Sequence, residues 1–173
     1  MNWDKAKIIE WLTFSEKIKI GDCSAWLETA YPKFAMVWML FNSLYSQDLK
    51  NKYDSTQIRN FIQNNDTLHK QLINTSEEYK NQVENLKNLL EEKELKSLTR
   101  NKSSITRRNY PIKLEEPKEF DQVIDIIYTV RNNLFHGGKV QTDNERDSKL
   151  CFYSYNILKI FIEEYIENSG GIV

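Results

Sequence analysis

Apolar residues recur every three or four positions along most of this chain, which is the period of an α-helix and not the alternation of a β-strand. The 173 residues include only 5 glycines and 3 prolines, too few for a turn-dense all-β architecture. This spacing predicts an all-α fold, with residues 1–173 forming a single domain. The expected architecture is an up-and-down bundle of four to five main helices.

The expected helices are bounded by capping residues, glycines and prolines. They cover residues 3–19, 24–30, 33–46, 54–64, about 67–98, 118–135 and about 144–167. The helix over 33–46 is apolar nearly all round, which is typical of a central helix in a bundle. Its aromatic residues follow the helical period and are expected in the core: Trp38, Phe41 and Tyr45.

Two polar residues on these helices have opposite expected locations. Asn42 lies inside the apolar helix, so we expect it to be buried and to need a hydrogen-bonding partner. His69 lies in a polar helix beside Lys70, and we expect it on the surface.

Composition and charge exclude several classes of protein. The chain carries 24 Lys and Arg against 25 Asp and Glu, and its net charge of −1 excludes a polycation that coats nucleic acid. Cys23 and Cys151 are too few for a cysteine-based zinc site, and we expect neither a metal nor a cofactor. The charged start and the short apolar stretches predict no signal peptide and no membrane span, so the expected location is the cytoplasm.

The positive charge is concentrated in residues 95–114. This segment holds six Lys and Arg and no acid, so its net charge is +6. Because the whole chain has a net charge of −1, the remaining residues together carry −7. Its many Ser, Thr and Asn residues predict a basic, flexible loop. A loop of this kind can bind an RNA backbone without reading its sequence, or it can be a solvated linker. The candidate RNA-binding residues in it are Arg100, Lys102, Arg107 and Arg108.

Arg131 is the residue whose position most needs an explanation. At about 100° per residue it falls inside the apolar stripe that Ile127, Val130 and Leu134 define on the helix over 118–135. A guanidinium stays protonated, and burying it unpaired is costly. It therefore needs an acidic partner, such as Asp147 or Glu163, or an opening through which it meets an anion.

A second polar edge of the same helix holds Asp125, Asn132 and His136. Arg131 can hold a phosphate, and His136 can transfer a proton near neutral pH. Asn132 can orient either group. These are the parts for RNA cleavage by the neighbouring 2′-hydroxyl, a route that needs no metal. The alternative is structural: Arg131 paired with a buried acid, and His136 closing the helix.

Arg131 and His136 lie about 140° apart on an ideal helix, and each chain offers one such histidine. A symmetric dimer that places this segment against its own copy removes both difficulties. Lys139 follows closely and either assists a phosphate or is a solvated surface residue.

Several motifs resemble the HEPN superfamily, in its bacterial, Apea-like form. Arg131 to His136 matches its R-x4-H signature, within a run from Val130 to Lys139 similar to VRNxLFHGGK. Trp38, Phe41, Asn42 and Tyr45 resemble an early aromatic motif of the family, and Arg146-Asp147 resembles a recurrent pair in its last helix. Gly138 stands where toxins paired with a nucleotidyltransferase antitoxin can carry a modified tyrosine, so the resemblance does not extend to that regulation.

The resemblance implies an all-α homodimer with metal-independent endoribonuclease activity. Arg131 and His136 would be catalytic and Asn132 auxiliary. Such proteins act as toxins or phage-defence (abortive infection) effectors, with a cognate antitoxin or regulatory protein as partner. The alternative is a catalytically inactive module that binds nucleic acid, nucleotide or a partner protein. A third reading is a structural dimeric bundle.

Overall fold

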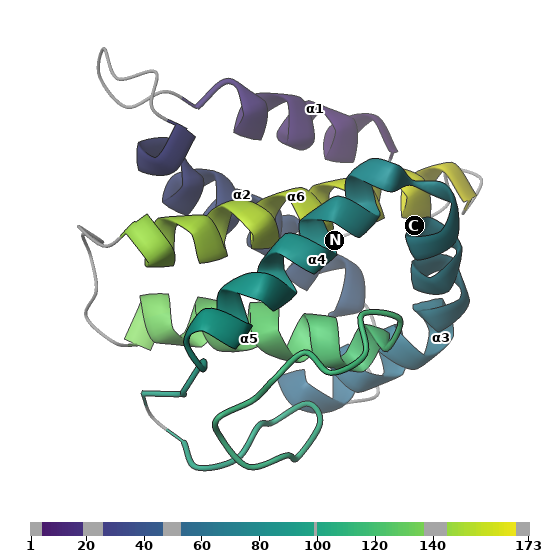
Figure 1. The fold of residues 1–173 in the computed structure, drawn as a ribbon. Coiled ribbons are helices and arrows are strands. Elements are labelled where there is room, and N and C mark those ends of the chain that lie inside the picture. Colours follow the sequence, from purple (N-terminus) through teal and green to yellow (C-terminus); the bar gives the residue numbers. More distant parts are fainter. Residues whose placement is uncertain (1–4, 19–25, 47–52, 99, 137–144, 169–173) are drawn as a thin grey trace.

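The computed structural model describes residues 5–18, 26–46, 53–98, 100–136 and 145–168 (Figure 1). Within these ranges the protein is all-helical, as the sequence predicts. The described residues form six helices and no named strand: α1 (Lys5–Glu16), α2 (Trp26–Tyr45), α3 (Asp54–Thr75), α4 (Glu77–Glu92), α5 (Phe120–His136) and α6 (Glu145–Asn168). None of these helices is both long enough and apolar enough to span a membrane.

α2 and α6 make the most extensive helix pair and form the centre of the fold (Figure 1). α1 covers α2, α4 crosses α6, and α5 packs against α3 and α6. The central position of α2 and the burial of Trp38, Phe41 and Tyr45 confirm the sequence prediction. Phe120 of α5 and Phe161 of α6 are fully buried with ring centroids 4.7 Å apart, and this contact joins the two helices at the core.

α2 is one helix where the sequence predicted two, over 24–30 and 33–46. Pro32 lies inside it and removes one backbone hydrogen bond, a change that costs roughly 3 kcal/mol in a helix interior. Burial of the apolar side chains of α2 against α6 offsets this cost. Asn42 is exposed, so its predicted burial is wrong. It shares with Met39, one turn earlier, the face of α2 that its neighbours leave open.

The chain turns a corner at Ser76, inside the helix that the sequence predicted over about 67–98. α3 runs unbroken from Asp54 to Thr75, past the predicted end at residue 64. Ser76 then begins α4, and its hydroxyl accepts a hydrogen bond from the backbone N–H of Tyr79 (3.2 Å). Two acidic residues follow in the first turn, where the helix dipole favours negative charge. The corner therefore needs neither glycine nor proline.

His69 is fully buried at this corner, so its predicted surface location is wrong. Its Nε2 lies 2.9 Å from the carbonyl oxygen of Pro117, and its Nδ1 lies 2.9 Å from the hydroxyl of Tyr79. A carbonyl only accepts, so Nε2–H donates to Pro117 and Nδ1 accepts from Tyr79. The ring stacks on Phe120 at 4.8 Å. The neutral imidazole thus ties α3 to α4 and to the start of α5.

We expect the stability of the fold to fall below neutral pH through His69. Burial lowers the pKa of His69 from 6.5 to about 4. Between these two pH values the imidazole is protonated in the unfolded chain but not in the folded protein. The stabilisation is complete above pH 6.5 and is lost as the pH falls towards 4, a loss of about 3 kcal/mol. Urea denaturation of the wild type and of His69→Gln between pH 7.5 and 4 measures it. Parallel pH profiles for the two proteins would contradict this role.

Candidate functional site

Arg131 lies near the end of α5, with its guanidinium among three aromatic rings. The guanidinium carbon is 5.8 Å from the ring centroid of Trp38, 6.0 Å from that of Tyr128 and 5.4 Å from that of Phe135. These rings, here called the Arg131 cage, attract a cation through their negative faces. Nη1 of Arg131 also donates a hydrogen bond of 2.8 Å to Oδ1 of Asn132, which is itself buried. Arg131 is thus held within the apolar stripe by cation–π contacts with three rings and by a hydrogen bond to the amide of Asn132.

Among the described residues, no carboxylate forms an ion pair with Arg131. Of the two acids that the sequence offered as partners, Glu163 lies 3.6 Å from Lys159 instead, and Asp147 lines a small pocket with Asn133 on another side of α5. Nε of Arg131 is buried and has no acceptor in the described part of the chain. Within the described ranges, the predicted alternative of an arginine paired with a buried acid is therefore not observed.

Asp54 is linked to the Arg131 cage through Tyr128, and it accepts hydrogen bonds from two tyrosines. The hydroxyl of Tyr45 donates to Oδ1 of Asp54 (2.7 Å), and the hydroxyl of Tyr128 donates to Oδ2 (3.1 Å). Burial, and then Asp54 itself, raises the pKa of Tyr45, and burial likewise raises the pKa of Tyr128, so both hydroxyls stay protonated. Asp54 is the first residue of α3, and Tyr53 stands at the N-cap without a side-chain hydrogen bond.

The predicted polar edge of Asp125, Asn132 and His136 is divided in the structure. Asn132 turns to Arg131, and Asp125 turns to the segment that precedes α5. His136 is the last residue of α5, and its side chain lies outside the described residues, as does the whole of Lys139. Arg131 and Asn132 are thus the two catalytic candidates that the structure brings together.

Residues 95–114, predicted as a flexible loop, pack against α5 as an irregular lobe, here called the basic lobe (Figure 1). Single β-bridges join Leu95 to Ile112 and Lys102 to Asn109. Apolar side chains anchor the segment in the core: Leu95, Ile105, Ile112 and Leu114. These four apolar residues indicate in the sequence that the segment packs against the core, although its overall composition is polar.

Asp125 of α5 is the main polar anchor of the basic lobe. Its side chain is 2% exposed, and its two carboxylate oxygens accept hydrogen bonds from the hydroxyls of Ser103 and Thr106. Burial raises the pKa of Asp125, and the two hydroxyl donors oppose that shift. The Ser103 hydroxyl also accepts from the backbone N–H of Ile105 (2.9 Å), so the turn of the lobe is built around this one carboxylate.

The two residues that follow Asp125 at helical spacing also hold the lobe. The hydroxyl of Thr129 lies 2.9 Å from that of Tyr110. The side chain of Asn133 accepts from the backbone N–H of Leu98 (3.0 Å) and donates to the carbonyl oxygen of Lys96 (2.8 Å). Residues at i, i+4 and i+8 share one face of a helix, so α5 devotes a full polar stripe to this segment.

The four predicted RNA-binding residues of the lobe are all exposed: Arg100, Lys102, Arg107 and Arg108. Nη1 of Arg100 donates to the hydroxyl of Ser104, and Arg108 lies 3.8 Å from Glu115. On the helical wheel the stripe that holds the lobe is centred about 160° from Arg131. The lobe that carries these cations is therefore held by the side of α5 opposite Arg131.

Comparison with protein-family models, with curated proteins and with solved structures found no match for this chain. Within the described ranges, no group of three or more His, Cys, Asp or Glu side chains is placed to hold a metal ion. The case for a function therefore rests on the residues themselves and on their arrangement.

We expect Asp125→Ala to release the basic lobe while the helices remain folded. The change removes two hydrogen bonds to a carboxylate, each worth roughly 1.5–3 kcal/mol, so tryptic cleavage within the lobe should be at least about tenfold faster. Limited proteolysis followed by mass spectrometry measures the rate, and circular dichroism monitors the helices. Asp121→Ala, one turn earlier on α5, is the matched control. Equal cleavage rates in the two variants would show that Asp125 does not anchor the lobe.

Proposed function

We propose that this protein is a metal-independent endoribonuclease of the HEPN type, with Arg131 as the residue that binds the scissile phosphate. The observation that carries the proposal is a guanidinium held among three rings and one amide, with no carboxylate of the described residues in an ion pair with it. Arg131 is half-buried, and its Nε is buried without an acceptor among the described residues. A phosphate would supply a counter-charge and acceptors in bidentate geometry. The tyrosine pair on Asp54 supports this, because it satisfies the nearby acid without Arg131.

The proposed reaction is an attack by the 2′-hydroxyl of RNA on the adjacent phosphorus. The O2′–P bond forms, the P–O5′ bond breaks, and the products carry a 2′,3′-cyclic phosphate and a 5′-hydroxyl. One His136 accepts the proton of the 2′-hydroxyl, and a protonated imidazole donates a proton to the leaving 5′-oxygen. Arg131 neutralises the charge that grows on the phosphate, and Asn132 holds the guanidinium in place.

A homodimer belongs to this proposal. Two imidazoles serve best as acid and base, and each chain supplies one in the R-x4-H motif. A two-fold axis at the end of α5 brings two copies of the motif into one cleft. Phe135, in the Arg131 cage, is 47% exposed and offers an apolar surface for this contact. The resemblance to HEPN proteins further suggests a toxin or phage-defence effector, controlled by an antitoxin or regulatory protein.

A second candidate function is nucleic-acid binding without cleavage, as in the inactive members that the resemblance also includes. The observation that favours it is the basic lobe, which carries four exposed cations and is held by the side of α5 away from Arg131. Such a surface holds an RNA backbone by charge without placing a phosphodiester at Arg131. The two functions differ in one measurable outcome, which is cleavage.

We expect the purified protein to cleave RNA in EDTA and to leave 2′,3′-cyclic phosphate ends. His136→Ala should lower the rate by roughly 10²–10⁴, the usual contribution of a general acid or base. Arg131→Ala should lower it while circular dichroism still shows a folded protein. Arg59→Ala, which removes an arginine of α3, is the matched control and should retain full activity. RNA with a blocked 2′-hydroxyl should stay intact. Absence of cleavage at high enzyme concentration would favour the binding module.

We expect the basic lobe to contribute a salt-dependent part of RNA affinity. Each lost phosphate contact lowers the slope of log K against log salt by about 0.7 on a single strand. Arg107→Ala combined with Arg108→Ala should therefore reduce the slope by about 1.4. Binding is measured with 2′-O-methyl RNA, which resists cleavage. Lys87→Ala on α4, where Lys87 pairs with Glu91, is the control. An unchanged slope in the double variant would remove the lobe from the RNA interface.

A further inference from the structure

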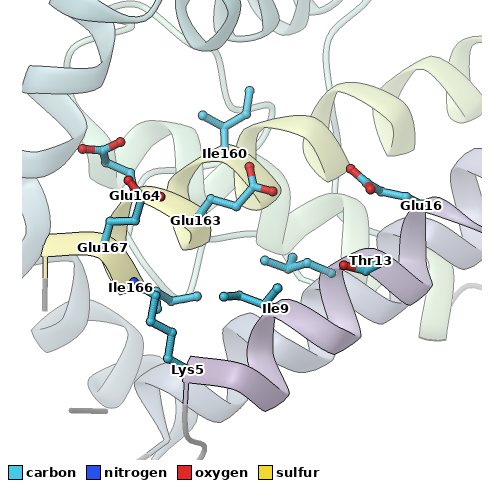
Figure 2. A pocket seen from close by; sticks show the side chains of 10 residues that line it. Lys5, Ile9, Thr13, Glu16, Ile160, Glu163, Glu164, Ile166 and Glu167 are labelled. Carbon is cyan, nitrogen blue, oxygen red and sulfur yellow. The ribbon is translucent and has the colours of Figure 1, made fainter. Parts of the chain in front are cut away.

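An open groove lies between α1 and α6 (Figure 2). α1 packs more closely on α2 than on α6, so a cavity of about 440 Å³ remains between the facing sides of α1 and α6. α1 covers one side of the α2–α6 pair, and α5 lies on the other side (Figure 1). The groove therefore belongs to a different face of the protein from the proposed nuclease site.

The accessible floor of this groove is aliphatic. Ile9 of α1 is 47% exposed and lines the cavity. Ile160 of α6 is half-buried and lines the same cavity from the other side. Figure 2 shows the side chain of Ile9 directed into the space between the two helices. An apolar side chain from another molecule would remove this surface from water.

The walls of the groove are acidic. They carry four carboxylates from the two helices: Glu16, Glu163, Glu164 and Glu167. One lysine, Lys159, pairs with Glu16 and Glu163, and Lys5 lies at the other end of the groove. Burial, together with the charges of Glu16 and Glu78, raises the pKa of Glu163, while Lys159 opposes the shift. The carboxylates thus outnumber the cations, and a basic ligand would relieve their repulsion.

The length of the groove limits what it can hold. Its residues extend from position 160 to 167 on α6 and from 5 to 16 on α1, which is about 10–16 Å at 1.5 Å per residue. This is two to three turns of helix. An aliphatic floor between acidic walls suits an amphipathic helix whose apolar side chains are flanked by Lys or Arg. Exposed rims of this charge also speed the encounter with a basic partner.

We propose that the groove between α1 and α6 binds a short basic amphipathic helix of a partner protein, which inserts one or two aliphatic side chains between Ile9 and Ile160. The basic lobe of a second copy of this chain does not fit this description. It has no helix of its own, and three residues of α5 hold it in place: Asp125, Thr129 and Asn133. The proposal is independent of the RNA chemistry and concerns how the protein is bound by another protein.

Fluorescence anisotropy with a labelled peptide of about 14 residues tests the proposal on the full-length protein. The probe carries two leucines four residues apart and lysines beside them on the same helical face. Glu164→Lys combined with Glu167→Lys should weaken its binding at least tenfold, and Ile9→Asp should weaken it similarly. Glu91→Lys combined with Glu92→Lys, on α4, makes the same change in net charge outside the groove and should leave the affinity unchanged.

A scrambled peptide of the same composition and a peptide with Glu in place of Lys complete the experiment. Neither should bind as the probe does, because the first lacks a continuous apolar face and the second has the wrong charge. Equal binding of the scrambled peptide, or equal weakening by the control variant, would reduce the effect to net charge and overturn the proposal. Failure of the probe to bind would also overturn it, as would self-association of the wild type that Glu164→Lys with Glu167→Lys abolishes.

Discussion

The burial of α5 is the constraint on which the rest of this structure depends. Nine consecutive residues, 122–130, are buried, and three of them are polar: Gln122, Asp125 and Thr129. A buried polar group without a partner costs more than a hydrogen bond returns, so each must be satisfied. Gln122 accepts from the backbone N–H groups of Glu115 and Glu116, and the other two hold the basic lobe. The irregular segment before α5 is thus ordered by the polar residues of α5.

The same constraint shapes the candidate site at the far end of the helix. Arg131 emerges where α5 meets α2, among side chains that are aromatic and not acidic. Cation–π contacts stabilise a guanidinium without neutralising it, whereas an ion pair would consume its charge. Asp54, which Tyr128 of the cage contacts, accepts hydrogen bonds from two phenols. The arrangement holds the guanidinium without an ion-paired carboxylate among the described residues, which is what the proposed phosphate binding requires.

The sequence predicted the helical class, the central place of α2 and the position of Arg131 in an apolar stripe, because these follow from the helical period alone. The predicted helix boundaries were wrong where one residue type is compatible with two positions in a helix. Pro32 reads as a helix start but lies inside α2, and Ser76 reads as an ordinary helical residue but caps α4. His69 has polar neighbours in sequence, yet its own position on α3 faces the core together with Ile62 and Leu72. Helical phase would have placed His69 better than the polarity of its neighbours did.

The sequence alone determined the helical class and the place of Arg131 in the apolar stripe of α5, because both follow from the helical period. The tertiary structure decided what the side chains of α5 meet. Tyr128 donates to Asp54 across 74 positions of sequence, and the ring of Trp38 lies over Arg131 from another helix. A helical wheel gives the direction of a side chain, but the identity of its neighbour depends on which helix packs there. That packing is set by the burial of the whole core and not by any local pattern.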